Sequence, residues 1–171
     1  MDPSVVNWRT SALDLVRASS YSERINPLLD NPFLGTIPYD CDDRSNCFGT
    51  VLYLLGIVGE ERPLFVDRKD MVSFLEKHCT PKKTPDGLVG FWEVFRDEQI
   101  LTHAGLYLGE ASGMETLFHQ PGTGERFDLL PIPSARIDDP IKIRVAYYEA
   151  LPSAKSFELS PRFTYLKLPV A

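Results

Sequence analysis

Cys47, His103 and His119 have the residue types and the order along the chain that nucleophilic catalysis requires. Cys47 follows the polar pair Ser45-Asn46 and opens an apolar run, which predicts that its thiol lies at the start of a helix. The positive end of a helix dipole favours the thiolate, the nucleophilic form of cysteine. A histidine from a facing strand can pair with that thiolate while a second polar group orients its ring. On spacing alone, a core cysteine and hydrogen-bonded strand histidines explain the same pattern.

Helical periodicity and capping residues predict that helices come first along the chain. The segment capped by Ser45 or Asn46 is apolar nearly all round, as expected of a central buried helix. Asp67 is the expected cap of a later helix. Prolines and turn-forming residues from Asn26 onward predict a loop that ends in an acidic stretch. The predicted helices are Val5–Ala18, Cys47–Gly56 and Arg68–His78.

The second half of the chain changes to the two-residue period of strands. In the clearest segment, His103, Gly105 and Tyr107 share one face, and Ala104 and its alternate neighbours share the other. Helices followed by strands predict an α+β fold, with N-terminal helices packed on a mostly antiparallel sheet. The 171 residues contain no linker-like stretch, which predicts a single domain over residues 1–171. The predicted strands are Gly87–Phe95, Leu101–Leu108, Met114–Phe118, Arg126–Leu130, Ile141–Tyr148 and Arg162–Leu168.

Charge and hydropathy exclude several classes of partner. A net charge of -6 argues against nucleic acid, because binding to phosphates relies on clustered Lys and Arg. The longest apolar stretch, Cys47 to Gly59, is too short to cross a bilayer, so no membrane partner is expected. The first residues lack a basic segment followed by an apolar one, which predicts a soluble protein made in the cytoplasm without the usual export signal.

No cofactor or metal is expected. The acidic loop from Asp40 to Asp43 lacks the ligand pattern of a calcium loop, since Arg44 stands where another carboxylate is needed. The spacing of Cys41, Cys47, His78 and Cys79 does not follow that of zinc sites. A disulfide between Cys41 and Cys47, which would block the proposed nucleophile, stays open. The stretch Pro121-Gly122-Thr123-Gly124 lacks the ending of a phosphate loop and predicts a hairpin turn.

The segments around the cysteine and the histidines resemble the NlpC-type cysteine peptidase family, whose members are similar to a circularly permuted papain. The family's Asp-Cys-Ser-Gly-Phe-Val motif is matched by Asn46-Cys47-Phe48-Gly49-Thr50-Val51, with Cys, Gly and Val in register. Its Gly-Asp-Leu-Val-like strand is matched by Asp86 to Trp92, and its His-Val-Gly-Ile-Tyr-Leu-Gly strand by His103-Ala104-Gly105-Leu106-Tyr107-Leu108-Gly109. Its strand ending in Ile-His-Ala before a glycine turn is matched by Leu117 to Gly124. The similarity covers residues 33–124.

The resemblance implies a papain-like thiol peptidase or amidase with Cys47 as nucleophile, His103 as its base and His119 holding the His103 ring, although Gln120 could take the orienting role. It implies bacterial peptidoglycan stem peptides as substrate and Tyr39, Asn46 and Phe48 as substrate-binding residues. In the family, an acid and a serine at positions 46 and 48 recognise a substrate amine, so that recognition is altered here. Phe48 either shapes an apolar subsite or packs in the core beside Leu52.

The same resemblance leaves the biological setting open between recycling of wall fragments in the cytoplasm and export by a dedicated secretion system. An exported amidase toxin would have an inhibitory immunity protein as its partner. Acyl transfer or deamidation of a protein side chain would use the same three residues, Cys47, His103 and His119. A binding domain that keeps the fold without catalysis is the remaining alternative.

Overall fold

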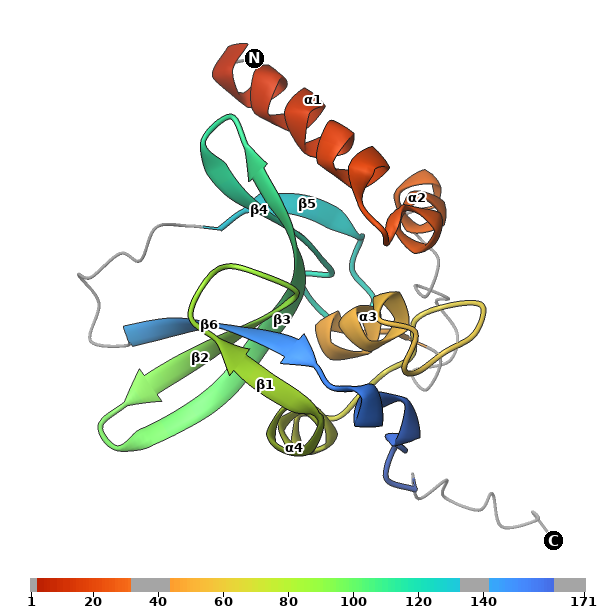
Figure 1. Cartoon of the computed structure of the whole chain (residues 1–171), viewed down its shortest axis with the longest axis vertical. Helices are drawn as coiled ribbons and strands as arrows, with labels where there is room; N and C mark the ends of the chain where they lie inside the picture. Colours follow the sequence, from red (N-terminus) through yellow and green to blue (C-terminus); the bar gives the residue numbers. More distant parts are fainter. Residues whose placement is uncertain (1–2, 32–43, 133–141, 162–171) are drawn as a thin grey trace, which may run out of the picture.

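The computed structural model describes residues 3–31, 44–132 and 142–161, with side chains from residue 7 onward. Its helices precede its strands along the chain, so the predicted α+β class is confirmed (Figure 1). None of the helices in these ranges is long and apolar enough to span a membrane. The elements are α1 Pro3–Ala18, α2 Ser22–Asp30, α3 Cys47–Leu54, α4 Arg68–His78, β1 Cys79–Lys82, β2 Leu88–Phe95, β3 Glu98–Ala111, β4 Met114–His119, β5 Asp128–Pro131, β6 Lys142–Ala150 and the short 3₁₀ helix η2 Pro152–Ser156.

The strands form a 6-stranded sheet in the order β1-β6-β2-β3-β4-β5. All of its strand pairs are antiparallel, as the sequence predicts for most of the sheet. Figure 1 shows α1 and α2 on one side of the molecule, α3 near the centre and α4 beside β1. Both α1 and α3 pack on β3, which is the longest strand and carries His103.

The core consists of two clusters of buried side chains that meet at α3. Phe74 and Leu52 belong to the cluster between α3, α4 and the sheet, and neither is exposed. Trp8 and Phe118 belong to the second cluster, beneath α1. All eight residues of α3 are buried, as its all-round apolar sequence predicts. The packing of α3 against the sheet therefore holds the thiol of Cys47 in the core.

Two elements differ from the sequence prediction. The helix α2 forms where a turn-rich loop was expected, even though Pro27 lies inside it. Ile25 and Leu28 of α2 are completely buried, and this burial offsets the hydrogen bond that a proline cannot make. The strand β1 also was not expected, because Pro81 marked the end of helical patterning. It lies at the edge of the sheet, where a proline is tolerated.

The other elements match their predicted positions apart from their ends. The predicted strand Arg162–Leu168 lies outside the described residues. The stretch from Pro121 to Gly124 connects the antiparallel strands β4 and β5, and the backbone N–H of Glu125 bonds the carbonyl of Gly122 at 3.1 Å. The predicted hairpin turn is therefore confirmed. The single-domain organisation stays a prediction.

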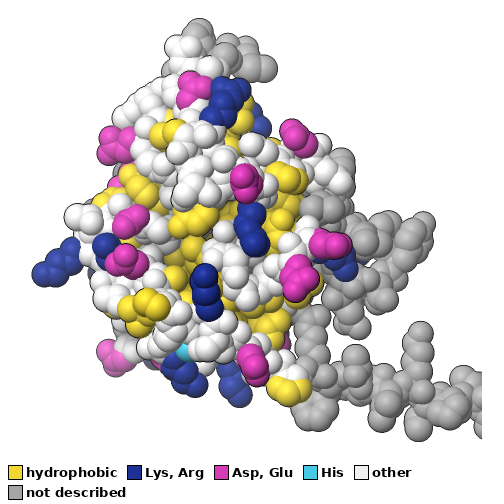
Figure 2. All heavy atoms as spheres, turned by 45° about the vertical axis from the view of Figure 1, so that its right-hand side comes forward, with side chains coloured by type: hydrophobic (Ala, Val, Ile, Leu, Met, Phe, Trp, Pro, Cys, Tyr) yellow, Lys and Arg dark blue, Asp and Glu magenta, His cyan; other side chains and the backbone are white. Residues whose placement is uncertain are grey.

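Charged side chains on the visible face of Figure 2 are scattered among apolar ones. Lys and Arg side chains stand singly beside Asp and Glu, and they do not gather into one basic patch on this face. Such mixing is what an acidic chain with ordinary composition gives.

Candidate active site

Cys47 is the first residue of α3 and is 7% exposed. The backbone N–H groups of Ala104 on β3, of Phe48 and of Cys47 itself act on its sulfur and lower the pKa of the thiol. Burial is nevertheless the largest influence and raises the pKa of the thiol, against these N–H groups and the charge of Arg68. The helix start therefore supplies donors to the sulfur, as expected, but in this conformation the thiol is protonated at neutral pH.

Asn46 explains why α3 begins at Cys47. Its side-chain oxygen accepts from the backbone N–H of Gly49 at 2.9 Å and of Val66 at 3.2 Å. Its amide nitrogen donates to the carbonyl of Val66 at 2.8 Å. Both polar atoms of this predicted substrate-binding residue thus have partners within the protein, and they join the helix cap to the segment that leads into α4.

Gln120 joins the loop before α3 to the end of β4. Its completely buried side chain accepts from the hydroxyls of Ser45 and Thr50, each at 2.9 Å, and donates to the carbonyl of Glu125 at 2.8 Å. Each polar atom of the amide is therefore engaged away from the histidines. The backbone adds a further tie, from the N–H of Gly124 to the carbonyl of Ser45 at 2.9 Å.

His103 and His119 are brought together by the pairing of β3 with β4. Nε2 of His103 and Nδ1 of His119 are 2.8 Å apart, and the two rings meet edge to face at 87°. Burial, followed by the neighbouring His119, lowers the pKa of His103 to about 4. Burial also lowers the pKa of His119, which Asp128 partly counteracts. Two neutral imidazoles satisfy this contact, because one ring donates its N–H to the unprotonated nitrogen of the other. His119, and not Gln120, is therefore the residue that holds the His103 ring.

The sulfur of Cys47 and the ring of His103 approach the same stretch of β3 from different sides. Ala104 packs in the core cluster with Cys47, whereas His103 lies beside Phe91, with ring centroids 5.5 Å apart. Successive side chains of a strand point to opposite faces. Within the described parts of the chain, the ring nitrogen of His103 bonds His119, and no hydrogen bond joins it to Cys47. A direct pair between the two catalytic candidates stays a prediction.

A pocket of about 340 Å³ lies beside the thiol. Phe48 borders it and is also buried in the core with Leu52, so the packing beside Leu52 is confirmed, and its role as an apolar subsite stays a prediction. His103 is not part of the lining, but Thr102, two residues before Ala104, is. The lining residues are Asn46, Cys47, Phe48, Phe65, Val66, Asp67, Arg68, Thr102, Pro121, Gly122 and Thr123.

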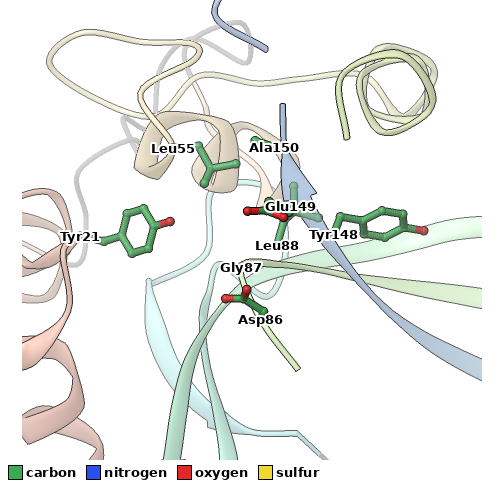
Figure 3. A pocket seen from close by; sticks show the side chains of 8 residues that line it. All are labelled: Tyr21, Leu55, Asp86, Gly87, Leu88, Tyr148, Glu149 and Ala150. Atoms are coloured by element: carbon green, nitrogen blue, oxygen red, sulfur yellow. The ribbon is translucent and has the colours of Figure 1, made fainter. Parts of the chain in front are cut away.

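A second pocket of about 250 Å³ lies between the start of α2, the end of α3 and β6. Figure 3 shows the hydroxyl of Tyr21 pointing across it and the side chain of Tyr148 pointing away. Its two carboxylates, Asp86 and Glu149, are both within ion-pair distance of Lys82, at 3.6 and 3.3 Å. This single lysine offsets one of the two negative charges, so the pair of carboxylates keeps a net negative charge.

Several residues singled out by the sequence fall elsewhere. Tyr39, Cys41 and the acidic loop from Asp40 to Asp43 lie outside the described residues. Cys47 and Cys79 carry free thiols, and Cys79 is buried at the end of α4 with its pKa raised to about 12 by burial. Within 3–31, 44–132 and 142–161, no group of His, Cys, Asp and Glu could hold a metal ion.

The sequence did not single out Ala104 or Arg68. A backbone donor such as the N–H of Ala104 leaves no signal in residue type. Arg68 was assigned only as the first residue of a helix, and its place in the pocket depends on the bonds between Asn46 and Val66.

Comparisons of the chain with protein-family models, with curated proteins and with solved structures find no match. The class of protein must therefore be argued from the motifs and from the geometry around Cys47.

The two buried histidines predict a loss of stability in acid. The pKa of His103 falls from its ordinary 6.5 to about 4 on folding, so the unfolded chain binds the proton more tightly between these values. The stabilisation is complete above pH 6.5 and is lost as the pH falls toward 4. We expect denaturant titrations to show a drop on the order of 2 kcal/mol in unfolding free energy from this group. A His103→Gln variant should lose most of this pH dependence, whereas His78→Gln on α4 should keep it; equal slopes in all three proteins would contradict the interpretation.

Proposed function

We infer that the protein is a papain-like cysteine hydrolase that cleaves amide bonds, with bacterial cell-wall peptides as its substrate class. One observation carries the inference: Cys47, at the start of α3, packs in the core with Ala104, the residue directly after His103, and the backbone N–H of Ala104 lowers the pKa of its thiol. The nucleophile therefore lies against the stretch of β3 that carries the base, although the two side chains are on different sides of the strand, and His119 bonds the ring of the base at 2.8 Å. The order Cys, His, His along the chain and the matching segments of the NlpC-type family support the same conclusion.

The chemistry starts from two neutral groups. His103 takes the proton of the Cys47 thiol while the sulfur attacks the carbonyl carbon of the amide. The resulting oxyanion is met by backbone N–H groups at the start of α3. The imidazolium of His103 gives its proton to the departing amine, and a thioester remains. His103 then takes a proton from water, whose oxygen attacks the thioester carbonyl. The carbon–sulfur bond breaks, a carboxylic acid is released, and His103 returns its proton to the sulfur.

This mechanism requires the His103 ring to turn from Phe91 toward the sulfur when substrate binds. Because the side chains of His103 and Ala104 point to opposite faces of β3, the ring must pass the edge of β3 beyond the end of β4 at His119, and this requires the backbone near His103 to move as well. Catalytic hydrogen bonds are often long or misaligned before substrate binds and tighten in the complex. His119 accompanies this change as a positioning residue, since it acts through the His103 ring.

The substrate class rests on the resemblance, and the departures at positions 46 and 48 modify it. The amide of Asn46 is engaged in capping α3, so recognition of a substrate amine by this residue is not proposed. Phe48 gives the pocket an apolar wall. Export by a dedicated secretion system, with an inhibitory immunity protein as partner, belongs to the same proposal.

Purified wall fragments provide the direct test. Incubation with the protein is expected to release free amines, detected with an amine-reactive reagent and identified by mass spectrometry. The matched control is the same preparation after alkylation of Cys47 by iodoacetamide, which should release none. No release by the unmodified protein, despite a thiol that alkylates, would overturn hydrolysis of these peptides and favour acyl transfer or deamidation.

A further inference from the structure

The pocket beside Cys47 combines an apolar wall with a charged end. Its apolar lining is formed by Phe48 of α3 and by Phe65 and Val66 of the segment before α4. Asp67 and Arg68 bring one negative and one positive charge to the lining where α4 begins. The pocket is therefore built to distinguish substrates by charge as well as by shape.

Arg68 is the cation among the described residues that line this pocket. Its side chain is exposed, and it takes part in none of the salt bridges or hydrogen bonds found in the described ranges of the chain. Arg68 and Cys47 line the same pocket, and the charge of Arg68 lowers the pKa of the thiol, although burial raises it more. A guanidinium without a protein partner is suited to bind a carboxylate with two parallel hydrogen bonds.

The surroundings of Arg68 reinforce this preference. Arg68 is the first residue of α4, whose positive end adds to the local attraction for anions. The whole chain carries a net charge of -6, which repels anionic molecules in general. A carboxylate that reaches the thiol must therefore be attracted locally.

We propose that Arg68 is a specificity-determining residue that binds a carboxylate of the substrate next to the scissile amide. The proposal rests on the proposed hydrolase function and adds the chemistry of its preferred substrate. The carboxylate is either the free α-carboxylate of a short peptide or the side chain of an acidic residue, since Arg68 recognises the same group in both.

Alkylation of Cys47 tests the charge preference without any turnover. Both iodoacetate and iodoacetamide alkylate the thiolate through their CH₂ group and release iodide. Only iodoacetate carries a carboxylate. The ratio of their rates at Cys47, measured by peptide mass spectrometry, is independent of the thiol pKa because both reagents react with the same thiolate. We expect the ratio of iodoacetate to iodoacetamide to fall about three- to tenfold in Arg68→Gln, as expected for one lost charge contact.

Two further variants identify the cause of any change. Arg68→Lys should recover part of the ratio, since it keeps the charge without the planar fork. Lys69→Gln removes the same charge from the neighbouring residue, which does not line the pocket, and should leave the ratio unchanged. An unchanged ratio in Arg68→Gln, or an equal fall in Lys69→Gln, would overturn the proposal.

The source of the carboxylate is resolved with thiol-reactive peptides. N-chloroacetyl-glycine presents an α-carboxylate, and N-chloroacetyl-aspartic acid α-amide presents a side-chain carboxylate; N-chloroacetyl-glycinamide is the neutral reference. The preferred source is the compound whose rate at Cys47, relative to the reference, falls most in Arg68→Gln. These outcomes are separate from hydrolysis. A ratio that changes in Arg68→Gln, without amine release from wall fragments, would retain the carboxylate site and reject the hydrolase. Amine release with an unchanged ratio would reject only the carboxylate site.

Discussion

Replacement of Cys47 by serine is expected to lower the rate of amide hydrolysis at least about a thousandfold while the protein stays folded. A serine hydroxyl at this position is a far poorer nucleophile than the thiol, since an alcohol gives up its proton to a histidine far less readily than a thiol does. The change in volume is small, so the packing of α3 against the sheet should persist. Initial rates of amine release, together with thermal unfolding followed by circular dichroism, measure both effects.

Cys79→Ser is the matched control for this result. The two cysteines have nearly equal exposure, 7% for Cys47 and 8% for Cys79, and both belong to the same core cluster. Only Cys47 lines the pocket of about 340 Å³. Cys79→Ser should therefore keep its activity. Equal activities of Cys47→Ser and the unmodified protein would remove Cys47 from the mechanism.

Gly49→Ala is expected to destabilise the protein by at least about 3 kcal/mol. A Cβ atom added at Gly49 would clash with the backbone carbonyl oxygen of Leu64, which packs directly against α3. A backbone carbonyl cannot turn aside as a flexible side chain can, so either α3 or the segment before Val66 must move. Because Asn46 bonds Val66 from the same turn of α3, that movement also strains the helix cap. Urea denaturation gives the free energy of unfolding directly.

A second glycine separates this clash from the general cost of the substitution. A Cβ at Gly122 would meet only the flexible end of the Glu125 side chain, at 3.0 Å. Gly122→Ala should therefore change the unfolding free energy much less than Gly49→Ala does. Similar values for the two variants would mean that the close approach of Leu64 to α3 does not constrain the fold.

Periodicity located most of the fold because burial in this chain follows regular patterns. The helix α3 is apolar on every side and is completely buried, and β3 alternates as a strand should. Periodicity failed where long-range contacts override a local signal. The turn signal of Pro27 is outweighed by the burial of Ile25 and Leu28, and β1 depends on pairing with β6, which lies far away in the sequence.

The candidate site was predictable in part. The strand assignments brought His103 and His119 onto adjacent strands, and their hydrogen bond follows from the register of β3 with β4. The face of β3 that α3 covers could not be predicted, because a two-residue period separates His103 from Ala104 without saying which side a helix packs on. The irregular pairing of β2 and β3 near Phe91, which shifts the register just before His103, has no marker in the sequence.

The hydrogen bonds of Gln120 determine at what stage of folding the loop before Cys47 is joined to β4. Ser45 and Gln120 are 75 positions apart, and a contact over that distance closes late because the intervening chain must first be ordered. During synthesis, Cys47 leaves the ribosome long before the residue that anchors its loop. A nascent or truncated chain ending ahead of β4 therefore carries the Cys47 thiol without His119 and Gln120, and the proposed site is complete only once β4 has joined the sheet.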